Sequence, residues 1–523
     1  MLRPFSFGGD TSPAHALPGG FSNVPGDDVS GDGRVLNRDQ ATALATKLLR
    51  LVQEPSIGVL IEHNVRAVTK VANGRVLATN DGDELGIQFF SRFGSGLPVT
   101  VCANQLDDTL LRRVVDVATQ MAPPKAAHPD RIPEDPEDWA HYQYNKREYV
   151  PVSLWHDTTV SAMETARGTM LPQLIETLDA SMLVGAATVG LAARSTFYMY
   201  KHGLNAWSQE TDAEVTVTAR TPDGKASGWS GMANRDWSRI DATVVARDAI
   251  DLAHKSKNSV ALEPGRRTAI LGPAAVAQLV RLMARMFDAR DTDGGSTPFS
   301  AKSGSLPSKL GQRVMDPRLQ MVSDPADPLG GYPPFFEVGL WGYTPAGFPN
   351  PSRTWIENGV LKNLAYDTGY GMKQGKIPCG CPYSIRVSPM SGAQTATIEE
   401  MIANCAEGVY VNRFSDVSLV DFQSGLMTGV TRDGCFLVKH GKIERPIKNF
   451  RFTESPFFAF NKLEAIGVAQ RAAFGYTPPD REEQNVSYTE PPMGYGTRWP
   501  RLPIIVPPMM IQDFNFTALS DSV

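Results

Sequence analysis

Histidine is scarce in the second half of this 523-residue sequence. Seven of the eight histidines lie before residue 255, and the remaining one is His440. A hydrolytic zinc ion usually has three protein ligands, and two of them are commonly histidines of one helix. His440 follows a strand-like segment and precedes a glycine, which is typical of an exposed turn. The sequence therefore predicts no catalytic, cofactor-binding or metal-binding residue in this half, and none is predicted among the seven earlier histidines.

Long apolar runs and strongly basic stretches are also missing. No apolar run approaches the roughly 20 residues that cross a bilayer. The first 20 residues lack the apolar core of a signal peptide. The net charge is −5 with acids and bases mixed along the chain, so no segment suits a row of phosphates. We expect a cytoplasmic protein that binds neither membrane nor nucleic acid.

Cysteine is rare, with five residues at scattered positions, which argues against a disulfide framework. The exception is Cys379-Gly380-Cys381, in a loop rich in proline and glycine. This pair could bind a soft metal or act in redox chemistry. Two thiols in a turn are the favoured interpretation, because two thiolates fill only half of a tetrahedral site.

Composition divides the chain into three parts, since 523 residues exceed one compact core. Residues 1–36 contain seven glycines and four prolines, so we predict a flexible arm that is extended or ordered by a partner. Residues 37–263 are predicted to form an N-terminal domain of helices and strands. Residues 264–523 are predicted to form a strand-rich C-terminal domain, with the boundary near residues 262–265.

Local signals predict the elements of the N-terminal part. Asn37 and Gln40 are spaced as a capping box for a helix that ends before Pro55. A short strand at 57–62, a hairpin around Asn73-Gly74 and a further strand at 85–93 follow. Helices are predicted at 107–121, 157–179 and 241–257, and a hairpin at 213–232. Pro172 predicts a kink or a break in the second helix.

The C-terminal part begins with a strand at 267–271 and a helix from Pro273 to Phe287, with the proline in its first turn. Hairpins are predicted around Asn358-Gly359 and His440-Gly441. A helix at 398–407 and a final strand at 509–516 complete the pattern. We therefore predict an α+β fold with two lobes, in which the N-terminal lobe holds a mixed sheet with helices.

Five segments of the C-terminal part resemble, in order, motifs of the TldD/PmbA family. They include GRRTAILGPAAVAQLV and SRTWIENGVLKNLAYDTGYGMKQG, and their ranges are 265–280, 309–325, 352–375, 382–414 and 421–452. The resemblance implies a half-barrel-like C-terminal lobe. It also implies a relation to metallopeptidases whose zinc lies on a helix carrying H-E-x-x-x-H, with a further cysteine ligand near the C-terminus.

The helix that corresponds to the zinc helix, residues 273–287, departs from this pattern. It has no histidine or glutamate, neither type occurs from Pro264 to Phe336, and no cysteine follows Cys435. The chain therefore resembles the PmbA (TldE-like) branch, which lacks the motif and pairs with a TldD-like subunit carrying the zinc. The resemblance implies a non-catalytic subunit that shapes a cavity for proteolysis of unfolded or leader peptides, with no cofactor of its own.

Several alternatives remain open at this point. Arg281 and Arg285 could grip a substrate carboxylate, although a packed helix is favoured. The aromatic segment 330–351 could contact peptide, form an interface or pack within its lobe. The chain could instead be a non-enzymatic homodimer that binds peptides or assists assembly. It could also be an enzyme with a relocated site at Cys379 and Cys381.

Overall fold

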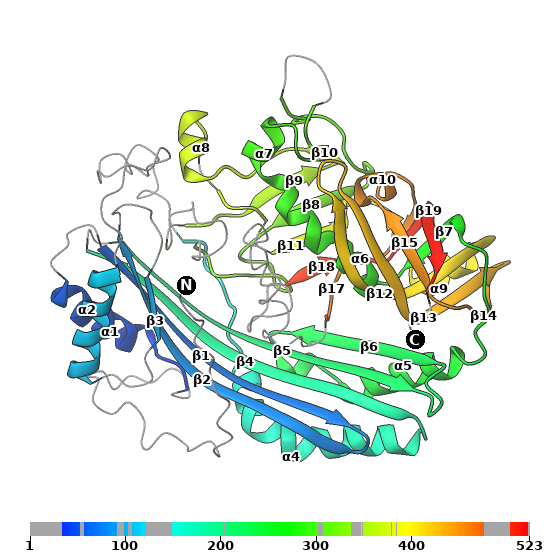
Figure 1. Cartoon of the computed structure of the whole chain (residues 1–523), viewed down its shortest axis with the longest axis horizontal. Coiled ribbons are helices and arrows are strands. Elements are labelled where there is room, and N and C mark those ends of the chain that lie inside the picture. The colour runs from blue at the N-terminus through cyan, green and yellow to red at the C-terminus, as the bar shows by residue number, and fades with distance from the viewer. Residues whose placement is uncertain are drawn as a thin grey trace, which may run out of the picture.

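The N-terminal lobe is built on a six-stranded sheet with the order β3-β2-β1-β4-β5-β6. The computed structural model describes residues 34–52, 57–91, 99–102, 107–121, 149–201, 204–301, 307–335, 347, 349–377, 379–382, 384–474 and 503–520. The strands are β1 (Ile57–Ala72), β2 (Arg75–Ser91), β3 (Val99–Cys102), β4 (Val184–Tyr200), β5 (Asn205–Arg220) and β6 (Ser227–Asn234). Every neighbouring pair is antiparallel. The long strands run along the lower part of Figure 1.

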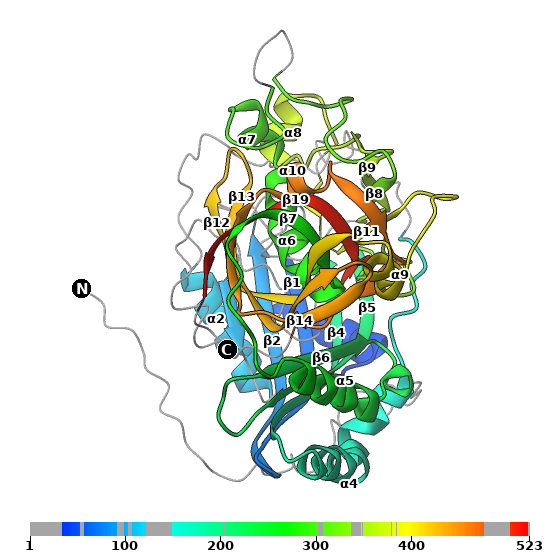
Figure 2. The same cartoon turned by 90° about the vertical axis from the view of Figure 1, so that its right-hand side faces the viewer.

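Four helices cover one face of this sheet. They are α1 (Arg38–Leu51), α2 (Asp108–Met121), α4 (Asp157–Ala180) and α5 (Ala242–Lys255), and the short η2 (Trp237–Arg239) precedes α5. Alternate strand residues such as Ile61, Val189 and Val215 pack with apolar helix residues in three clusters. Figures 1 and 2 show α4 and α5 beneath the sheet, on the side away from the C-terminal lobe. This face is apolar because strand side chains alternate between the two faces.

The C-terminal lobe contains a closed ring of five strands. These are β7 (Gly265–Leu271), β12 (Glu407–Asp421), β13 (Leu426–Lys439), β15 (Phe450–Glu454) and β19 (Met509–Leu519). The pairings β12–β7, β7–β19, β19–β15, β15–β13 and β13–β12 close the ring. Two further strands extend it, β14 (Lys442–Pro446) on β13 and β16 (Leu463–Ile466) on β19.

A second sheet of the C-terminal lobe has the order β10-β9-β8-β11-β18-β17. Its strands are β8 (Leu319–Ser323), β9 (Arg353–Glu357), β10 (Val360–Leu361), β11 (Ile385–Pro389), β17 (Gln470–Arg471) and β18 (Ile504–Val506). The helical elements are α6 (Pro273–Met283), η3 (Ala284–Phe287), α7 (Ala289–Asp293), α8 (Thr368–Lys373), α9 (Ile398–Ala403) and α10 (Pro456–Ala459). Helix α6 packs against β12 of the ring and β18 of the second sheet, so the main core lies around it.

The α+β fold with two strand-rich lobes is confirmed, with some corrections. The N-terminal sheet is antiparallel rather than mixed, because tight turns such as Asn73-Gly74 join its strands. The C-terminal half-barrel is a complete ring. The predicted strand at 57–62 and the first arm of the predicted hairpin form the single strand β1. The second arm of the hairpin and the predicted strand at 85–93 form β2. The strands are continuous because pairing on both sides of β1 extends across the polar residues.

The predicted turn and cap chemistry is largely confirmed. Positive φ angles occur in the turns Asn73-Gly74, Asn358-Gly359 and His440-Gly441, as type I′ turns require. The capping box of Asn37 and Gln40 is present. Pro172 lies inside one continuous helix, so a break there was wrong. Its missing N–H and the ring are accommodated on the exposed side of α4.

Among the described residues, no helix is both long and apolar enough to cross a membrane. The predicted arm lies outside the described residues except for residues 34–36. The division of the chain at residues 263 and 264 stays a proposal.

Candidate functional site

An acidic stripe on β5 faces the C-terminal lobe. Glu210, Asp212 and Glu214 alternate along the strand, and they are only 3%, 1% and 3% exposed. Their alternation places them on the face opposite the helices, since Ala213 and Val215 pack toward the helices. Three buried carboxylates are stable only if cations or hydrogen-bond donors reach them.

Arginines supply the partners of Glu210. Arg194 on β4, directly opposite in the register, donates from Nε to Glu210 Oε1 at 2.8 Å. Arg235, just after β6, donates from Nη1 to Glu210 Oε2 at 2.9 Å. Arg194 also lies 3.5 Å from Glu62 on β1. Glu210 thus bridges two guanidinium groups from neighbouring strands, and Glu62 extends the network across the sheet.

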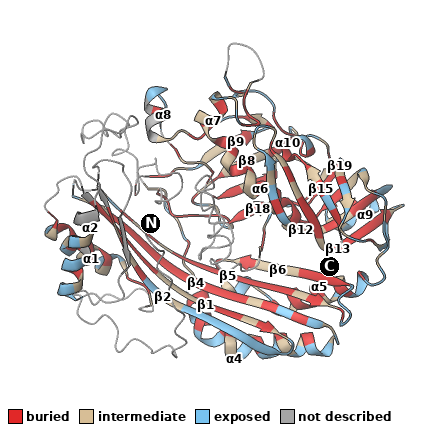
Figure 3. Ribbon diagram, viewed as in Figure 1, coloured by how far each residue is buried: buried red, intermediate tan, exposed pale blue. Residues whose placement is uncertain are grey.

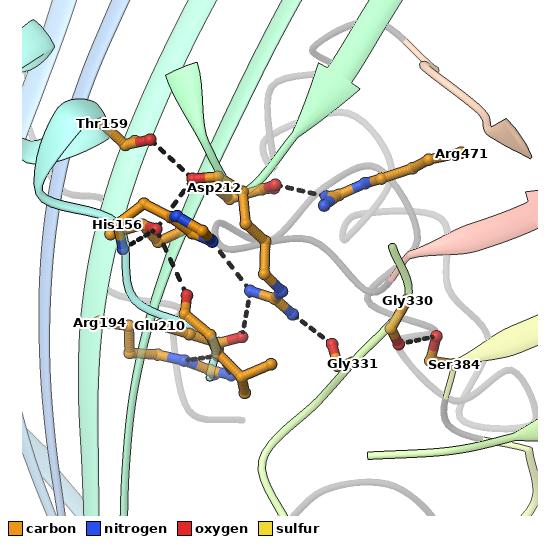
Figure 4. Close-up of polar contacts among 12 residues, drawn as sticks. His156, Thr159, Arg194, Glu210, Asp212, Gly330, Gly331, Ser384 and Arg471 are labelled. Carbon is orange, nitrogen blue, oxygen red and sulfur yellow. Dashed lines mark hydrogen bonds and ion pairs between the residues drawn. The ribbon is translucent and has the colours of Figure 1, made fainter. Parts of the chain in front are cut away.

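The same stripe connects the two lobes (Figure 4). Arg471 on β17 forms an ion pair with Asp212. The backbone N–H of Phe474 donates to Glu214 Oε2 at 3.1 Å. In the opposite direction, Arg235 Nη2 donates to the carbonyl of Gly331. Buried charge-assisted contacts therefore join the N-terminal sheet to two different segments of the C-terminal lobe.

Hydroxyl groups hold the backbone around this junction. Thr159 at the start of α4 donates to the carbonyl of Arg235 at 2.6 Å. Thr211 donates to the same carbonyl at 2.9 Å and accepts from the backbone N–H of His156 at 3.1 Å. On the C-terminal side, Ser384 donates to the carbonyl of Gly330 at 2.7 Å. These contacts fix the segments that carry Arg235 and Gly331.

At the junction, neighbouring charges favour the ionised form of Glu210 although its side chain is buried. Burial alone would raise the pKa of Glu210, but Arg194 and Arg235 outweigh it and the pKa is lowered. Burial lowers the pKa of Arg471, against the attraction of Asp212. The junction thus contains ion pairs of Glu210 and Asp212 and a backbone N–H that donates to Glu214. These contacts bind the lobes together rather than presenting a group poised for proton transfer.

Helix α6 corresponds to the zinc-binding helix of the family, and most of its side chains are packed in an apolar core. Val276, Leu279, Val280 and Met283 of α6 are buried in the main apolar core. The helix carries no histidine, cysteine, aspartate or glutamate, which are the side chains that bind zinc. The residues of α6 therefore do not fit a zinc ion.

The two arginines of this region already contact the protein. Arg281 Nη2 donates to the carbonyl of Val417 at a long 3.4 Å. The Arg285 guanidinium lies 5.6 Å from the centre of the Phe422 ring, a cation–π arrangement. A role for this pair in binding a substrate carboxylate stays a prediction.

The Cys379–Cys381 loop shows free thiols. Cys379 is buried, and its Sγ lies 3.5 Å from the carbonyl of Leu364. Burial raises the pKa of the Cys381 thiol well above its usual value, and Asp288 adds to the shift. A nucleophilic or metal-binding cysteine must be a thiolate, so this environment disfavours the relocated site.

The histidines do not gather into a metal site in the part of the chain that the structure describes. His440 is exposed in its turn. His63 is buried, accepts from the N–H of Leu36 through Nδ1 at 3.0 Å, and lies 2.6 Å from Asp83 through Nε2. Within the described ranges, no group of three or more histidine, cysteine or acidic residues could hold a metal ion.

Two aromatic residues of the 330–351 segment are packing residues. Tyr332 is buried in the main core. Phe335 reaches the N-terminal sheet and packs edge-on against Tyr198, with ring centres 5.4 Å apart. Phe336, Trp341, Tyr343 and Phe348 lie outside the described residues. The described part of the segment therefore contributes to the contact between the lobes.

An antiparallel sheet docked on a strand-rich lobe through a buried ion pair and hydrogen bonds defines a two-lobed α+β protein. Residues 264–518 match the family described as the PmbA/TldA metallopeptidase C-terminal domain. A metalloprotease TldD homolog from Buchnera aphidicola is 27% identical over 161 residues, which cover 29% of this chain and 32% of that relative. The chain thus spans about a third of the relative's length. The C-terminal part of the chain, residues 264–518, thus belongs to the PmbA/TldD family.

Solved structures share the fold over nearly the whole chain. A candidate modulator of a DNA gyrase from Thermotoga maritima superposes with a TM-score of 0.69 at 15% identity, covering 91% of this chain and 100% of that one. TldE from Thermococcus kodakarensis gives a TM-score of 0.65 at 13% identity, covering 91% and 99%. These likenesses establish the arrangement of both lobes.

Sequence reasoning missed the junction between the lobes. Its signal was the alternation of Glu210, Asp212 and Glu214 within an otherwise apolar strand pattern. Alternating acids usually indicate a solvated face. Only Arg194 on β4, Arg235 directly after β6 and Arg471 on β17 show that this face is buried.

Proposed function

We propose that this chain is the non-catalytic, TldE-like subunit of a cytoplasmic, two-subunit metallopeptidase. The zinc ion would be held by a TldD-like partner that carries H-E-x-x-x-H. In this role the chain walls a cavity in which unfolded or leader peptides are hydrolysed. It contributes shape and exposed backbone rather than reacting groups.

One observation carries the proposal. The C-terminal part of the chain belongs to a family of metallopeptidases, yet helix α6 offers alanine, valine, leucine, methionine, glutamine and arginine where the resemblance implies zinc ligands. None of these side chains is a usual zinc donor. A member of such a family with an intact fold and an apolar helix at this place is best suited to a supporting role.

The junction between the lobes supports the same role. A wall of a shared cavity has to keep its shape when a partner and a peptide bind. The buried ion pair of Arg471 with Asp212 and the hydrogen bond from Arg235 to the carbonyl of Gly331 hold the lobes in one relative orientation. Ion pairs in a low-dielectric setting require defined geometry, so this chain would act as a rigid half of the complex.

Native mass spectrometry with metal analysis tests the proposal. The purified chain should contain no stoichiometric zinc and should not cleave an unfolded peptide. Co-expression with an H-E-x-x-x-H-bearing family member should give a 1:1 complex with one zinc ion and peptidase activity. Changing the partner's first histidine to alanine should remove zinc and activity while the 1:1 complex persists.

Two results would contradict the proposal. Tightly bound zinc or peptide hydrolysis by the isolated chain would make it an enzyme in its own right. A stable homodimer that does not exchange with any such partner would favour the homodimeric peptide-binding protein instead.

A further inference from the structure

A buried histidine holds the short segment that precedes α1. His63 lies on β1 and is only 2% exposed. The backbone N–H of Leu36 donates to its Nδ1 at 3.0 Å. On the other side of the ring, Nε2 lies 2.6 Å from Oδ1 of Asp83 on β2. The imidazole therefore connects the segment before α1 to the hairpin of β1 and β2.

The two contacts fix the position of the proton on the neutral ring. A ring nitrogen that accepts a hydrogen bond carries no proton, so Nδ1 is bare and the single proton lies on Nε2. Nε2 then donates to the carboxylate of Asp83. A second proton has to bind at Nδ1, where it points at the N–H of Leu36. The charged ring and the docked segment thus exclude each other at this atom.

Loss of the acceptor leaves a buried donor without a partner. Leu36 is 2% exposed and Val35 is 9% exposed, so water does not reach this part of the backbone while the segment is docked. Buried N–H groups are nearly always hydrogen-bonded in proteins. Protonation of His63 therefore favours a displaced segment, in which water accepts from the N–H of Leu36.

The contact with Asp83 does not oppose this displacement. His63 pairs with Leu85, two residues from Asp83 along β2, so the ring and the carboxylate lie on the same face of one hairpin. The Asp83 side chain is 44% exposed. The carboxylate is thus available to the charged ring whether the segment is docked or displaced. The Nδ1 contact, in contrast, exists only in the docked state.

Other charged side chains around the ring are paired, exposed or on the opposite face of the sheet. On β4, the residue opposite His63 is the uncharged Ser195. Arg194 and Glu62 project from the other face, where they lie 3.5 Å apart. Further charged groups of the surrounding segments form the pairs Arg34–Glu164, Arg66–Glu84 and Arg167–Asp81, and Arg38 and Asp39 are exposed. Asp83 is therefore the carboxylate whose charge acts directly on the ring.

The docked segment is continuous with the start of α1. Asn37 caps this helix and forms the capping box with Gln40. Arg34, three residues earlier, forms an ion pair with Glu164 of α4. The bond from Leu36 to His63 lies between these two contacts, so it holds the segment against β1 at its centre.

We propose that His63 is a pH-sensitive contact that releases residues 34–36 from β1 in acid. At neutral pH the bare Nδ1 accepts from the N–H of Leu36 and the segment is docked. When Nδ1 takes a proton from the solvent, the segment leaves β1 and the imidazolium remains beside Asp83. This inference does not depend on the proposed function.

Hydrogen exchange of the full-length protein, measured by mass spectrometry on peptides that contain Leu36, tests this proposal. His63→Asn removes the titratable ring but keeps an acceptor, since the asparagine oxygen occupies the same δ position as Nδ1. The ratio of wild-type to variant exchange cancels the direct effect of pH on the exchange chemistry. An imidazole in water changes charge near about pH 6.5. This ratio should therefore rise about tenfold when the pH is lowered from about 7.5 to about 5.5.

Asp83→Asn provides a second measurement, which remains informative if His63→Asn disturbs folding. Without the carboxylate the ring takes up a proton less readily, so release should require a lower pH. Exchange at Leu36 at about pH 5.5 should then be slower than in the wild type by about threefold or more. Glu84→Gln is the matched control. It removes the neighbouring carboxylate, which pairs with Arg66, and should leave the acid response unchanged.

Two outcomes would overturn the inference. A ratio of wild-type to His63→Asn exchange that is equal at both pH values would show that the contact does not respond to protons. Acid acceleration of the same size in peptides from β5 would show a general loosening of the lobe instead of the release of one segment.

Discussion

Two buried surfaces of this protein have opposite chemistry. The inner face of the N-terminal sheet carries Glu210, Asp212 and Arg194, each at most 3% exposed. The surroundings of α6 carry Val280, Met283 and other apolar residues of equal burial. Figure 3 shows both regions as buried. Burial alone therefore does not distinguish them; the matching of charges does.

The difference shows how strongly each surface restricts the positions of its side chains. Apolar packing tolerates any filling of about the right volume, whereas buried ions need partners in defined positions. The junction between the lobes consequently has one favourable arrangement. The α6 region is packed with apolar side chains, whereas the resemblance implies that the corresponding helix of the catalytic family members holds a metal.

The largest expected effect comes from breaking the charged surface. Glu210→Ala would leave Arg194 and Arg235 buried without their shared carboxylate and should lower the free energy of unfolding by about 3–5 kcal/mol. Urea unfolding at pH 7 measures it. Ser208→Ala is the control on the same strand face: its hydroxyl has no hydrogen-bond partner within the described structure, so it should change stability by less than about 1 kcal/mol.

The effect of Glu210→Ala on the free energy of unfolding should depend on pH. The folded-state pKa of Glu210 is lowered by Arg194 and Arg235 against the effect of burial. Its contribution is therefore complete above the usual glutamate pKa and is lost as the pH falls toward the folded-state pKa. The stability difference between wild type and Glu210→Ala should shrink in acid. A constant difference down to pH 3 would contradict the ion-pair account.

The apolar surface should respond with a smaller loss. Met283→Ala removes a fully buried side chain from the core around α6 and should cost about 3 kcal/mol. Methionine has no titratable group, so the loss in the free energy of unfolding should be the same at pH 4 and pH 7. Leu282→Ala, at a half-buried neighbouring position, should cost less. A pH-dependent loss in Met283→Ala would show that the two surfaces are coupled.

The carboxyl group of Asp288, at the edge of the apolar region, offers a further test of the difference between the two surfaces. Burial, with help from Asp291 and Asp367, raises the pKa of Asp288 to about 6. The folded state binds this proton more tightly than the unfolded state, so stability is lost as the pH rises from about 4 to about 6. Asp288→Asn keeps the helix cap of α7 and should be more stable by about 1–2 kcal/mol at pH 7. Identical pH profiles for both proteins would refute the assignment.

The smallest expected loss of stability comes from the start of α1, which belongs to neither surface. Asn37→Ala removes the cap of α1, where the side chain accepts from the Gln40 N–H at 2.9 Å. The loss should be about 1 kcal/mol, measured by urea unfolding. Gln40→Ala, which removes only the return bond to the N–H of Asn37, should cost less. An effect as large as that of Glu210→Ala would mean that α1 is coupled to the junction.

Local chemistry made many elements predictable. The turns at Asn73-Gly74 and His440-Gly441 and the proline at the start of α6 follow from backbone preferences that each residue carries anywhere. The length of the strands was harder to predict from the sequence. Residues 57–72 contain a polar interruption at Glu62-His63-Asn64, yet they form one strand, since β2 and β4 pair with it on both sides.

The sequence by itself determined the family, the order of the elements and the lack of zinc-binding side chains in α6, because these depend on residue types and their spacing along the chain. The tertiary structure alone decided that Glu210, Asp212 and Glu214 are buried. It also decided that Arg194 and Arg235 pair with Glu210, that Arg471 pairs with Asp212, and that the backbone N–H of Phe474 donates to Glu214. These arginines lie on β4, directly after β6 and on β17. Whether a charge is solvated or paired depends on distances in space, which one-dimensional spacing does not fix.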